Sequence, residues 1–203
     1  MEKRIYISAD YSEYSSDTEV VKELTNWGKD RLHKVNFIDM SEVRSGSVSN
    51  DSDCRACDLK AEFNRQINAS SAVIFIVGEK TALRKAGSYC ERANLDQYLC
   101  SCAAYKQHWK GDLPCKVGMI TLCGVNDDFG NVNSYSYLEH EFQQARKKNK
   151  KIIVLYNSLR KRPDWLPTYL KPYESIAEPF WIKNYYGNKT GNYQYVKKEL
   201  KCD

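Results

Sequence analysis

Two glutamates, Glu139 and Glu141, are the candidate catalytic groups of this sequence. They lie in the segment 137–156, YLEHEFQQARKKNKKIIVLY, which is typical of an amphipathic helix that runs into a buried strand. Apolar residues recur there at the three-to-four spacing that places side chains on one helix face, namely Leu138, Phe142 and Ala145. The glutamates flank this stripe on opposite sides, so periodicity does not choose between them. A carboxylate beside the rim of a sheet can be catalytic; the plainer interpretation is a pair of solvated acids stabilised by the helix dipole.

Cysteines are the second group of residues that could carry chemistry. The chain has eight, and six fall in its middle: Cys54, Cys57, Cys90, Cys100, Cys102 and Cys115. The first two have the spacing of zinc ligands, but the pair Cys100-x-Cys102 is irregular, and a structural site needs two well-spaced pairs. We therefore expect no metal and interpret the cysteines as reduced, partly buried thiols. A zinc site is the alternative.

The chain predicts an α/β scaffold for these groups. Short apolar strands are expected at 4–8, 35–40, 72–77 and 152–155. Helices are expected between them, the first capped by Ser16 or Asp17 and another ending near Asn68. This alternation implies parallel pairing with helices on both faces of the sheet. The polar segment 41–53 is predicted to be a flexible loop.

Between residues 85 and about 134 the alternation stops. One helix near 93–105 and one strand at 117–122 are predicted there, but the segment is too short and polar for a core of its own. We therefore predict a single domain, 1–203, with a cysteine-rich insertion at about 85–134. An edge strand at 179–182 and a terminal helix at 195–200 complete the prediction.

Composition limits the classes of function. The chain has 203 residues, of which 42% are hydrophobic and 28% charged, as in ordinary globular proteins. No run approaches the roughly 20 apolar residues of a membrane span, and the start MEKRIYIS lacks the features of a signal peptide. We therefore expect a cytoplasmic protein without a membrane partner. The net charge is +5, and its densest basic run suits a solvated helix end, so nucleic-acid binding is not expected.

The candidate binding residues follow the predicted strands. In an open parallel sheet, ligands bind beyond the carboxyl ends of the strands, where the strand order reverses. This rule collects residues 8–11, 39–47 and 78–84 and the start of the Glu141 helix. The sequence has no Gly-x-Gly-x-x-Gly motif, no P-loop and no Gly-x-Ser-x-Gly motif. Its three histidines form no metal-ligand pattern. These absences count against a standard dinucleotide fold, a P-loop enzyme and an α/β-hydrolase.

The order of these segments resembles the TIR domain, and more narrowly the TIR-like proteins of bacterial Thoeris antiviral defence. The resemblance rests on IYISADY, VNFIDMS, LKAEFNRQINAS leading into AVIFIVG, and the Thr and Arg of EKTALR. It also rests on His140-Glu141-Phe142 before a Lys/Asn-rich turn and an Ile-Ile strand, and on PDWLP. It covers about residues 3–84 and 136–182, and the insertion departs from the family. It implies a flavodoxin-like fold, with a central parallel sheet of about five strands.

The resemblance implies an enzyme that cleaves the bond between nicotinamide and ribose in NAD+, which is the substrate and not a cofactor. The product would be ADP-ribose or a cyclic or conjugated form, acting as a second messenger for an effector protein. A phage-derived trigger and a homo-oligomer are further implied partners. Bond cleavage leaves positive charge on the ribose, which a nearby carboxylate stabilises. Nicotinamide is already a cationic leaving group, so one glutamate suffices.

The family match also assigns residues to the site, and it selects Glu141 over Glu139 as the catalytic residue. The implied substrate-binding residues are Ser8, Ala9, Asp10, Tyr11, Asp39, Ser41, Arg44, Thr81 and Arg84. Ser8 and Asp10 would line the pocket floor, and Tyr11 would stack on an aromatic ring. Arg44, in a gating loop, would pair with the pyrophosphate. Plainer roles stay open: a polar turn for Ser8 and Asp10, core closure for Tyr11, and a helix cap and a solvated charge for Thr81 and Arg84.

Two other functions also fit the sequence. A TIR adaptor would act by self-assembly, with the glutamate merely structural. A nucleoside deoxyribosyltransferase-like enzyme would also direct a glutamate at an N-glycosidic bond. Release of nicotinamide from NAD+ separates the first proposal from the adaptor, and deoxynucleoside substrates test the transferase.

Overall fold

The computed structural model describes residues 3–11, 15–29, 35–39, 52–84, 106–108, 111–113 and 136–202. The chain forms two compact units. The first unit comprises Met1–Met40, Gln66–Arg84 and Gln144–Asp203, and the second comprises Ser41–Arg65 and Lys85–Gln143.

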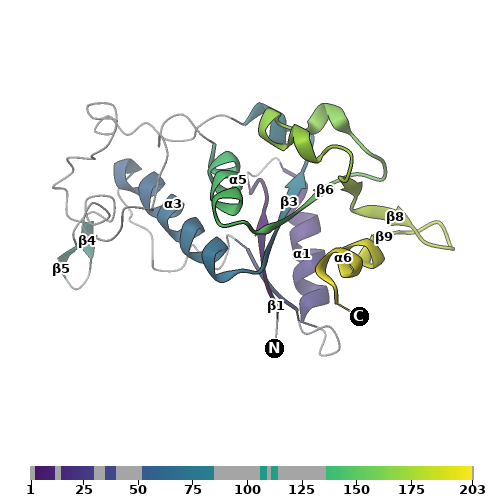
Figure 1. Cartoon of the computed structure of the whole chain (residues 1–203), viewed down its shortest axis with the longest axis horizontal. Coiled ribbons are helices and arrows are strands. Elements are labelled where there is room, and N and C mark those ends of the chain that lie inside the picture. The colour runs from purple at the N-terminus through teal and green to yellow at the C-terminus, as the bar shows by residue number, and fades with distance from the viewer. Residues whose placement is uncertain are drawn as a thin grey trace. The chain divides into compact units, whose positions relative to one another are not determined.

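A five-stranded parallel sheet forms the centre of the first unit (Figure 1). Its strands, in spatial order, are β2 (Val35–Ile38), β1 (Lys3–Ser8), β3 (Ala72–Val77), β6 (Lys151–Tyr156) and β7 (Glu178–Pro179). Every neighbouring pair in this sheet is parallel. The predicted parallel sheet of about five strands is confirmed. Because β2 and β3 lie on opposite sides of β1, the strand order reverses between β1 and β3.

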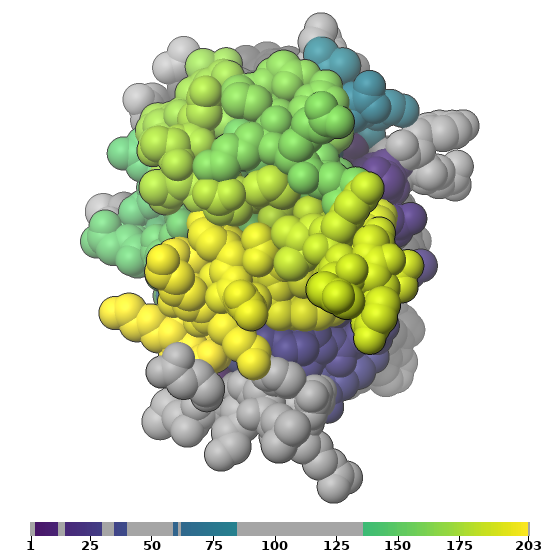
Figure 2. Space-filling model, turned by 90° about the vertical axis from the view of Figure 1, so that its right-hand side faces the viewer, coloured from purple at the N-terminus to yellow at the C-terminus, as the bar shows by residue number. Residues whose placement is uncertain are grey.

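Two helices of the first unit pack with one face of this sheet. They are α1 (Asp17–Gly28) and α6 (Tyr193–Leu200). A single apolar cluster joins them to the sheet; its members include Ile5, Ile7, Val20, Leu24, Ile74, Ile76, Ile153, Leu155, Val196 and Leu200. The strand residues in this set alternate along β1, β3 and β6, as the two-residue period of a strand requires. Figure 2 shows the C-terminal segment (yellow) beside α1 (blue-violet) on this side of the unit.

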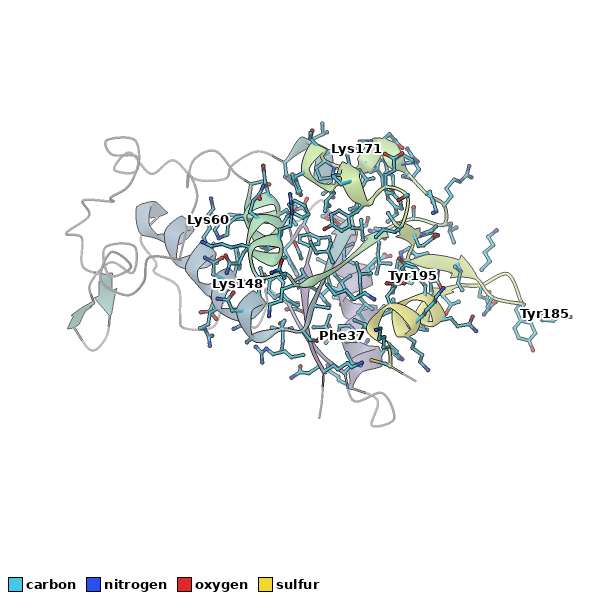
Figure 3. All side chains as sticks on the ribbon, viewed as in Figure 1. Phe37, Lys60, Lys148, Lys171, Tyr185 and Tyr195 are labelled. Carbon is cyan, nitrogen blue, oxygen red and sulfur yellow. The ribbon has the colours of Figure 1, made fainter. Side chains whose placement is uncertain are left out.

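The segment after β6 holds two 3-10 helices, Pro163–Trp165 and Thr168–Tyr173, and an antiparallel hairpin. The hairpin strands are β8 (Trp181–Lys183) and β9 (Lys189–Gly191). The first residue of β9 contacts α1: the ammonium of Lys189 lies 2.9 Å from the Glu19 carboxylate and 4.0 Å from the centroid of the Trp181 ring. The tip carries Tyr185 and Tyr186, which are 97% and 83% exposed (Figure 3).

The predicted edge strand at 179–182 is wrong in one respect. The structure divides it into β7, which pairs with β6, and β8, which pairs with β9. Phe180 separates the two strands and is fully buried in the core cluster. The chain therefore leaves the central sheet and enters the β8–β9 hairpin at Phe180, the residue whose side chain is buried in the core.

Two helix starts also differ from prediction. Ser52 and Asp53, placed in the predicted loop, are the first two residues of α3 (Ser52–Ala69). Helix α6 begins at Tyr193, two residues early, because the Asn192 side chain accepts a hydrogen bond from the Tyr195 backbone N–H. β2 ends at Ile38 instead of the predicted residue 40.

The second unit contains the N-terminal part of α3, the hairpin strands β4 (Lys106–His108) and β5 (Gly111–Leu113), and the start of α5 (Tyr137–Lys147). The predicted helix near 93–105 and strand at 117–122 lie outside the described residues. So do the side chains of the six cysteines in the zinc alternative, and the predicted insertion at about 85–134 stays a prediction. Of the helices described, none is both long and apolar enough to cross a membrane.

Candidate functional site

The candidate site of the first unit lies at the carboxyl ends of β1, β3 and β6, on the edge where parallel α/β sheets bind ligands. We call the polar side chains and the glycine gathered there the strand-end cluster. Its members are Asp10, Asp17, Gly78, Thr81, Arg84 and Asn157. Sequence analysis named Asp10, Gly78, Thr81 and Arg84, and it missed the roles of Asp17 and Asn157.

An ion pair joins the end of β1 to the turn after β3. The Arg84 Nη2 atom lies 2.5 Å from Oδ2 of Asp10, and the Arg84 Nε–H donates to the same oxygen at 2.6 Å. The Asp10 side chain is 9% exposed and that of Arg84 is 36% exposed. The structure therefore brings together two predicted site residues that are far apart in the sequence, and Arg84 is not a purely solvated charge.

The turn between Gly78 and Arg84 is closed by Thr81. The Gly78 backbone N–H donates to the Thr81 hydroxyl at 2.8 Å, and the Thr81 backbone N–H donates back to the Gly78 carbonyl at 3.1 Å. Thr81 begins a 3-10 helix, Thr81–Leu83, and its side chain is buried. This short helix delivers Arg84 to Asp10. The N-cap position of this helix is Lys80, so the Thr81 hydroxyl closes the turn after β3 and does not cap the helix.

Asp17, the first residue of α1, is buried, whereas sequence analysis named it only as one of two possible caps of this helix. Its carboxylate accepts hydrogen bonds from the Asn157 side chain, at 3.0 Å, from the Ser15 hydroxyl and from the Asp10 backbone N–H. Burial raises the pKa of Asp17 to about 6, and the negative charge of Asp10 also raises it, against the lowering effect of these hydrogen bonds. A Cβ atom at Gly78 would overlap Oδ1 of Asp17, so only glycine fits at that position.

Asn157 follows β6 directly, so the rule applied to the first three strands would have found it after the fourth. Its backbone N–H donates to the Val77 carbonyl at 2.9 Å. Its side-chain Oδ1 accepts from the Trp181 indole N–H at 2.8 Å. The sequence gives a weaker indication for Asp17 than for Asn157, because the burial of Asp17 depends on strands that are far away in the sequence.

The other predicted residues of the first unit lie at strand ends as expected. Ser8 is fully buried, and Ala9 and Asp39 are at most 9% exposed. Tyr11 is half-buried and packs against the apolar core cluster, which fits its plainer role. Two residues of the predicted gating loop, Ser41 and Arg44, lie outside the described residues.

Burial distinguishes the two glutamates of α5, which belong to the second unit. Glu141 is 1% exposed, whereas Glu139 is half-buried. Burial raises the pKa of Glu139, against the lowering effect of the positive charge of Lys60. Lys60 itself is fully buried on α3 (Figure 3).

Contacts between α3 and α5 hold this part of the second unit. The His140 imidazole lies 3.0 Å from Oδ1 of Asn64, and the rings of Phe63 and Tyr137 meet edge to face with centroids 5.7 Å apart. These contacts hold in place the turn of α5 that carries Glu141. In the part of the chain whose side chains are described, no group of three or more His, Cys, Asp or Glu could hold a metal ion.

Comparisons with known proteins bear mainly on the N-terminal part of the chain. A crystal structure of a prokaryotic SEFIR domain aligns with 98% of this chain and 94% of its own length, at 16% identity and a TM-score of 0.43. A comparison with curated proteins gives no significant match. Residues 6–87 match the family described as Thoeris protein ThsB, TIR-like domain, and they include Asp10, Asp17, Thr81 and Arg84. Over these residues the chain is similar to the TIR-like domain of Thoeris protein ThsB, the family that its sequence motifs indicated.

Proposed function

We propose that this protein is a TIR-domain enzyme that cleaves the nicotinamide–ribose bond of NAD+ in cytoplasmic antiviral defence. The observation that carries the proposal is the almost complete burial of Glu141, at the position where the family resemblance places its essential glutamate. Burying a carboxylate is costly, so a carboxylate withdrawn from water is a candidate functional group. The match to the Thoeris family over residues 6–87 supports a TIR-like protein of antiviral defence, which is the setting of the proposed enzyme.

Glu141 is the proposed catalytic residue. As nicotinamide departs, positive charge develops on the ribose, and a fixed carboxylate in a poorly hydrated environment stabilises that charge strongly. The same carboxylate could hold the ribose hydroxyls. Nicotinamide leaves as a neutral molecule, so the reaction needs no general acid.

Asp10 and Arg84 are the proposed binding residues of the first unit. Arg84 combines a partly exposed guanidinium with a position fixed by two contacts to Asp10. Such a cation suits an anionic group like the pyrophosphate of NAD+, because guanidinium and phosphate form charge-assisted hydrogen bonds. Arg44 stays a predicted second contact to the pyrophosphate, and Ser41 and Asp39 stay predicted residues of the gating loop.

The product in this proposal is ADP-ribose or a cyclised or conjugated form, which signals to an effector protein. A phage-derived trigger and self-association are proposed as the means of activation. NAD+ acts as the substrate, and the proposal includes no further cofactor.

The test is incubation of the purified protein with NAD+, with nicotinamide and nucleotide products followed by mass spectrometry. Glu141→Gln is expected to abolish turnover, and Glu139→Gln, two residues away on the same helix, is the matched control. Lysate from phage-infected cells is added in parallel to supply a trigger. Absence of nicotinamide in both conditions would reject the enzyme and favour the adaptor. Full turnover by Glu141→Gln would reject the catalytic assignment alone.

A further inference from the structure

Asp17 is a buried acid of the strand-end cluster that the proposed chemistry does not use. Three donors converge on its carboxylate from different parts of the fold. They are the Asp10 backbone N–H after β1, the Ser15 hydroxyl before α1, and the Asn157 side-chain amide after β6. The backbone of Gly78, after β3, packs against the same carboxylate. One side chain therefore contacts residues that follow three neighbouring strands.

The orientation of Asn157 is fixed by its other partner. The Trp181 indole N–H can only donate, so the atom of Asn157 that faces it at 2.8 Å must be the carbonyl oxygen. The amide nitrogen of Asn157 must then face Asp17 and Ser16, at 3.0 Å and 2.9 Å. Asn157 can therefore present only a donor to residue 17. With the Asp10 backbone N–H also a donor, residue 17 has to be an acceptor on both sides.

An asparagine at position 17 would keep fewer of these hydrogen bonds. Its single oxygen would have to accept from both the Asp10 backbone N–H and the Asn157 amide, because its NH2 group can face only the Ser15 hydroxyl. The carboxylate accepts all three, although its burial near the Asp10 carboxylate disfavours the charged form. Other neighbours carry little opposing charge: Asn157 and Gly78 are uncharged, and Arg84 is engaged by Asp10. The three donors thus require an acceptor at position 17, although burial there makes the ionised carboxylate unfavourable.

We propose that Asp17 is a positioning residue: by holding the Asp10 amide and the Asn157 side chain, it sets the place of the Asp10–Arg84 ion pair. Asp17 does not touch the substrate. Its effect on turnover rests on the proposed function, but its effect on the Asp10 backbone does not.

The experiment compares wild type with Asp17→Asn and with Glu19→Gln, a control that neutralises an exposed acid in the first turn of the same helix. The Asp10 amide and the Asn157 side-chain amide are followed by 15N NMR between pH 4.5 and 8. Wild type and Glu19→Gln should show a transition with a midpoint near pH 6 at both groups, and Asp17→Asn should not. For NAD+, kcat should fall by roughly 10- to 100-fold in Asp17→Asn, as expected for misplaced binding groups, and stay unchanged in Glu19→Gln.

The two arms separate failure of this proposal from failure of the proposed function. If wild type shows no turnover of NAD+, the proposed function fails and the NMR arm alone decides the role of Asp17. A wild-type Asp10 amide without the transition would overturn the proposal, as would Asp17→Asn with wild-type kcat. If Asp17→Asn does not fold, Asn157→Ala replaces it. Loss of that donor should move the transition at the Asp10 amide to higher pH, and an unmoved midpoint would overturn the proposal.

Discussion

The strand-end cluster and the exposed ion pairs of the C-terminal segment use the same chemical groups with opposite consequences. In the cluster, Asp17 is 1% exposed, and its hydrogen-bond partners come from the connection between β1 and α1 and from the residue after β6. In the C-terminal segment, pairs such as Lys189–Glu19, Arg162–Asp164 and Lys171–Glu174 lie in solvent, with each side chain at least 41% exposed. Exposed pairs are screened by water and salt, whereas buried groups are not. The cluster should therefore control position and pH dependence, and the exposed pairs should matter little.

The largest expected effect concerns the buried carboxylate of α5. Glu141→Gln should lower kcat for NAD+ by about 10²- to 10³-fold, because it removes a charge that stabilises the transition state. Steady-state kinetics measures this. Glu139→Gln, at the half-buried neighbouring position, should keep turnover within about threefold of wild type. Equal losses in the two variants would contradict the assignment by burial.

The second effect is a pH dependence of stability that depends on Asp17. Burial raises the pKa of Asp17 from its ordinary value of 3.8 to about 6, so the folded protein binds this proton more tightly than the unfolded chain does. The contribution of Asp17 to stability is therefore fully present below about pH 4 and is lost as pH rises through 6. Over that window it amounts to about 3 kcal/mol, at 1.36 kcal/mol for each pKa unit. Urea unfolding at several pH values gives the curves for wild type and Asp17→Asn.

The two curves should differ in slope between pH 4 and pH 6 and run parallel above pH 7. If the stability curves of wild type and Asp17→Asn were parallel over the whole pH range, Asp17 would have an ordinary pKa. The buried cluster would then not differ from the exposed ion pairs in its pH dependence.

The third effect is steric. Gly78→Ala should destabilise the fold by about 1–3 kcal/mol, because the new methyl group overlaps the Asp17 carboxylate and one of them must move. Gly187→Ala, at the exposed hairpin tip, has open space around its Cβ but a φ of +78°. It should cost about 1 kcal/mol through backbone strain alone. Chemical denaturation compares the two. A smaller cost for Gly78→Ala than for Gly187→Ala would contradict the tight packing at position 78.

The fourth effect tests the binding role of the ion pair. Arg84→Lys keeps the positive charge but loses the planar donors, so KM for NAD+ should rise about tenfold. The matched control is Arg162→Lys, at an exposed ion pair of the C-terminal segment. A rise in KM for both variants would point to a general charge effect and not to a defined contact.

The smallest effect should come from the exposed pair between α1 and β9. Glu19→Gln should change stability by about 0.5 kcal/mol or less, since both side chains are mostly in solvent. Thermal unfolding at low and high salt measures it. A larger loss at low salt would mean that this pair fastens the hairpin to α1 more firmly than its exposure indicates.

The sequence predicted the fold correctly where its hydrophobic pattern was continuous. β3 was predicted without error because AVIFIV is an unbroken apolar run between polar residues. The edge strand at 179–182 was predicted as one unit because periodicity does not show that the Phe180 side chain turns into the core. The start of α3 was placed late because Ser52 and Asp53 are also common in loops.

The candidate site was accessible only in part. The strand-end rule and the family resemblance placed Asp10 and Arg84 at the same site, but they did not predict the ion pair between them. Asp17 and Asn157 were missed because their roles arise from a contact between residues 140 positions apart. Local patterns cannot report such a contact. Glu139 and Glu141 were equivalent by helical period, and only packing distinguishes them.

The outermost strand of the sheet, β7, has only two residues, and the second is Pro179. Proline has no N–H, so it cannot donate a backbone hydrogen bond to an added strand. Immediately after it the chain turns inward at Phe180 and forms a separate ladder. A foreign strand would find almost no backbone to extend at this border. The sheet is thus closed to edge-to-edge aggregation at this border, so a strand added to the described sheet would have to pair with its other edge strand, β2.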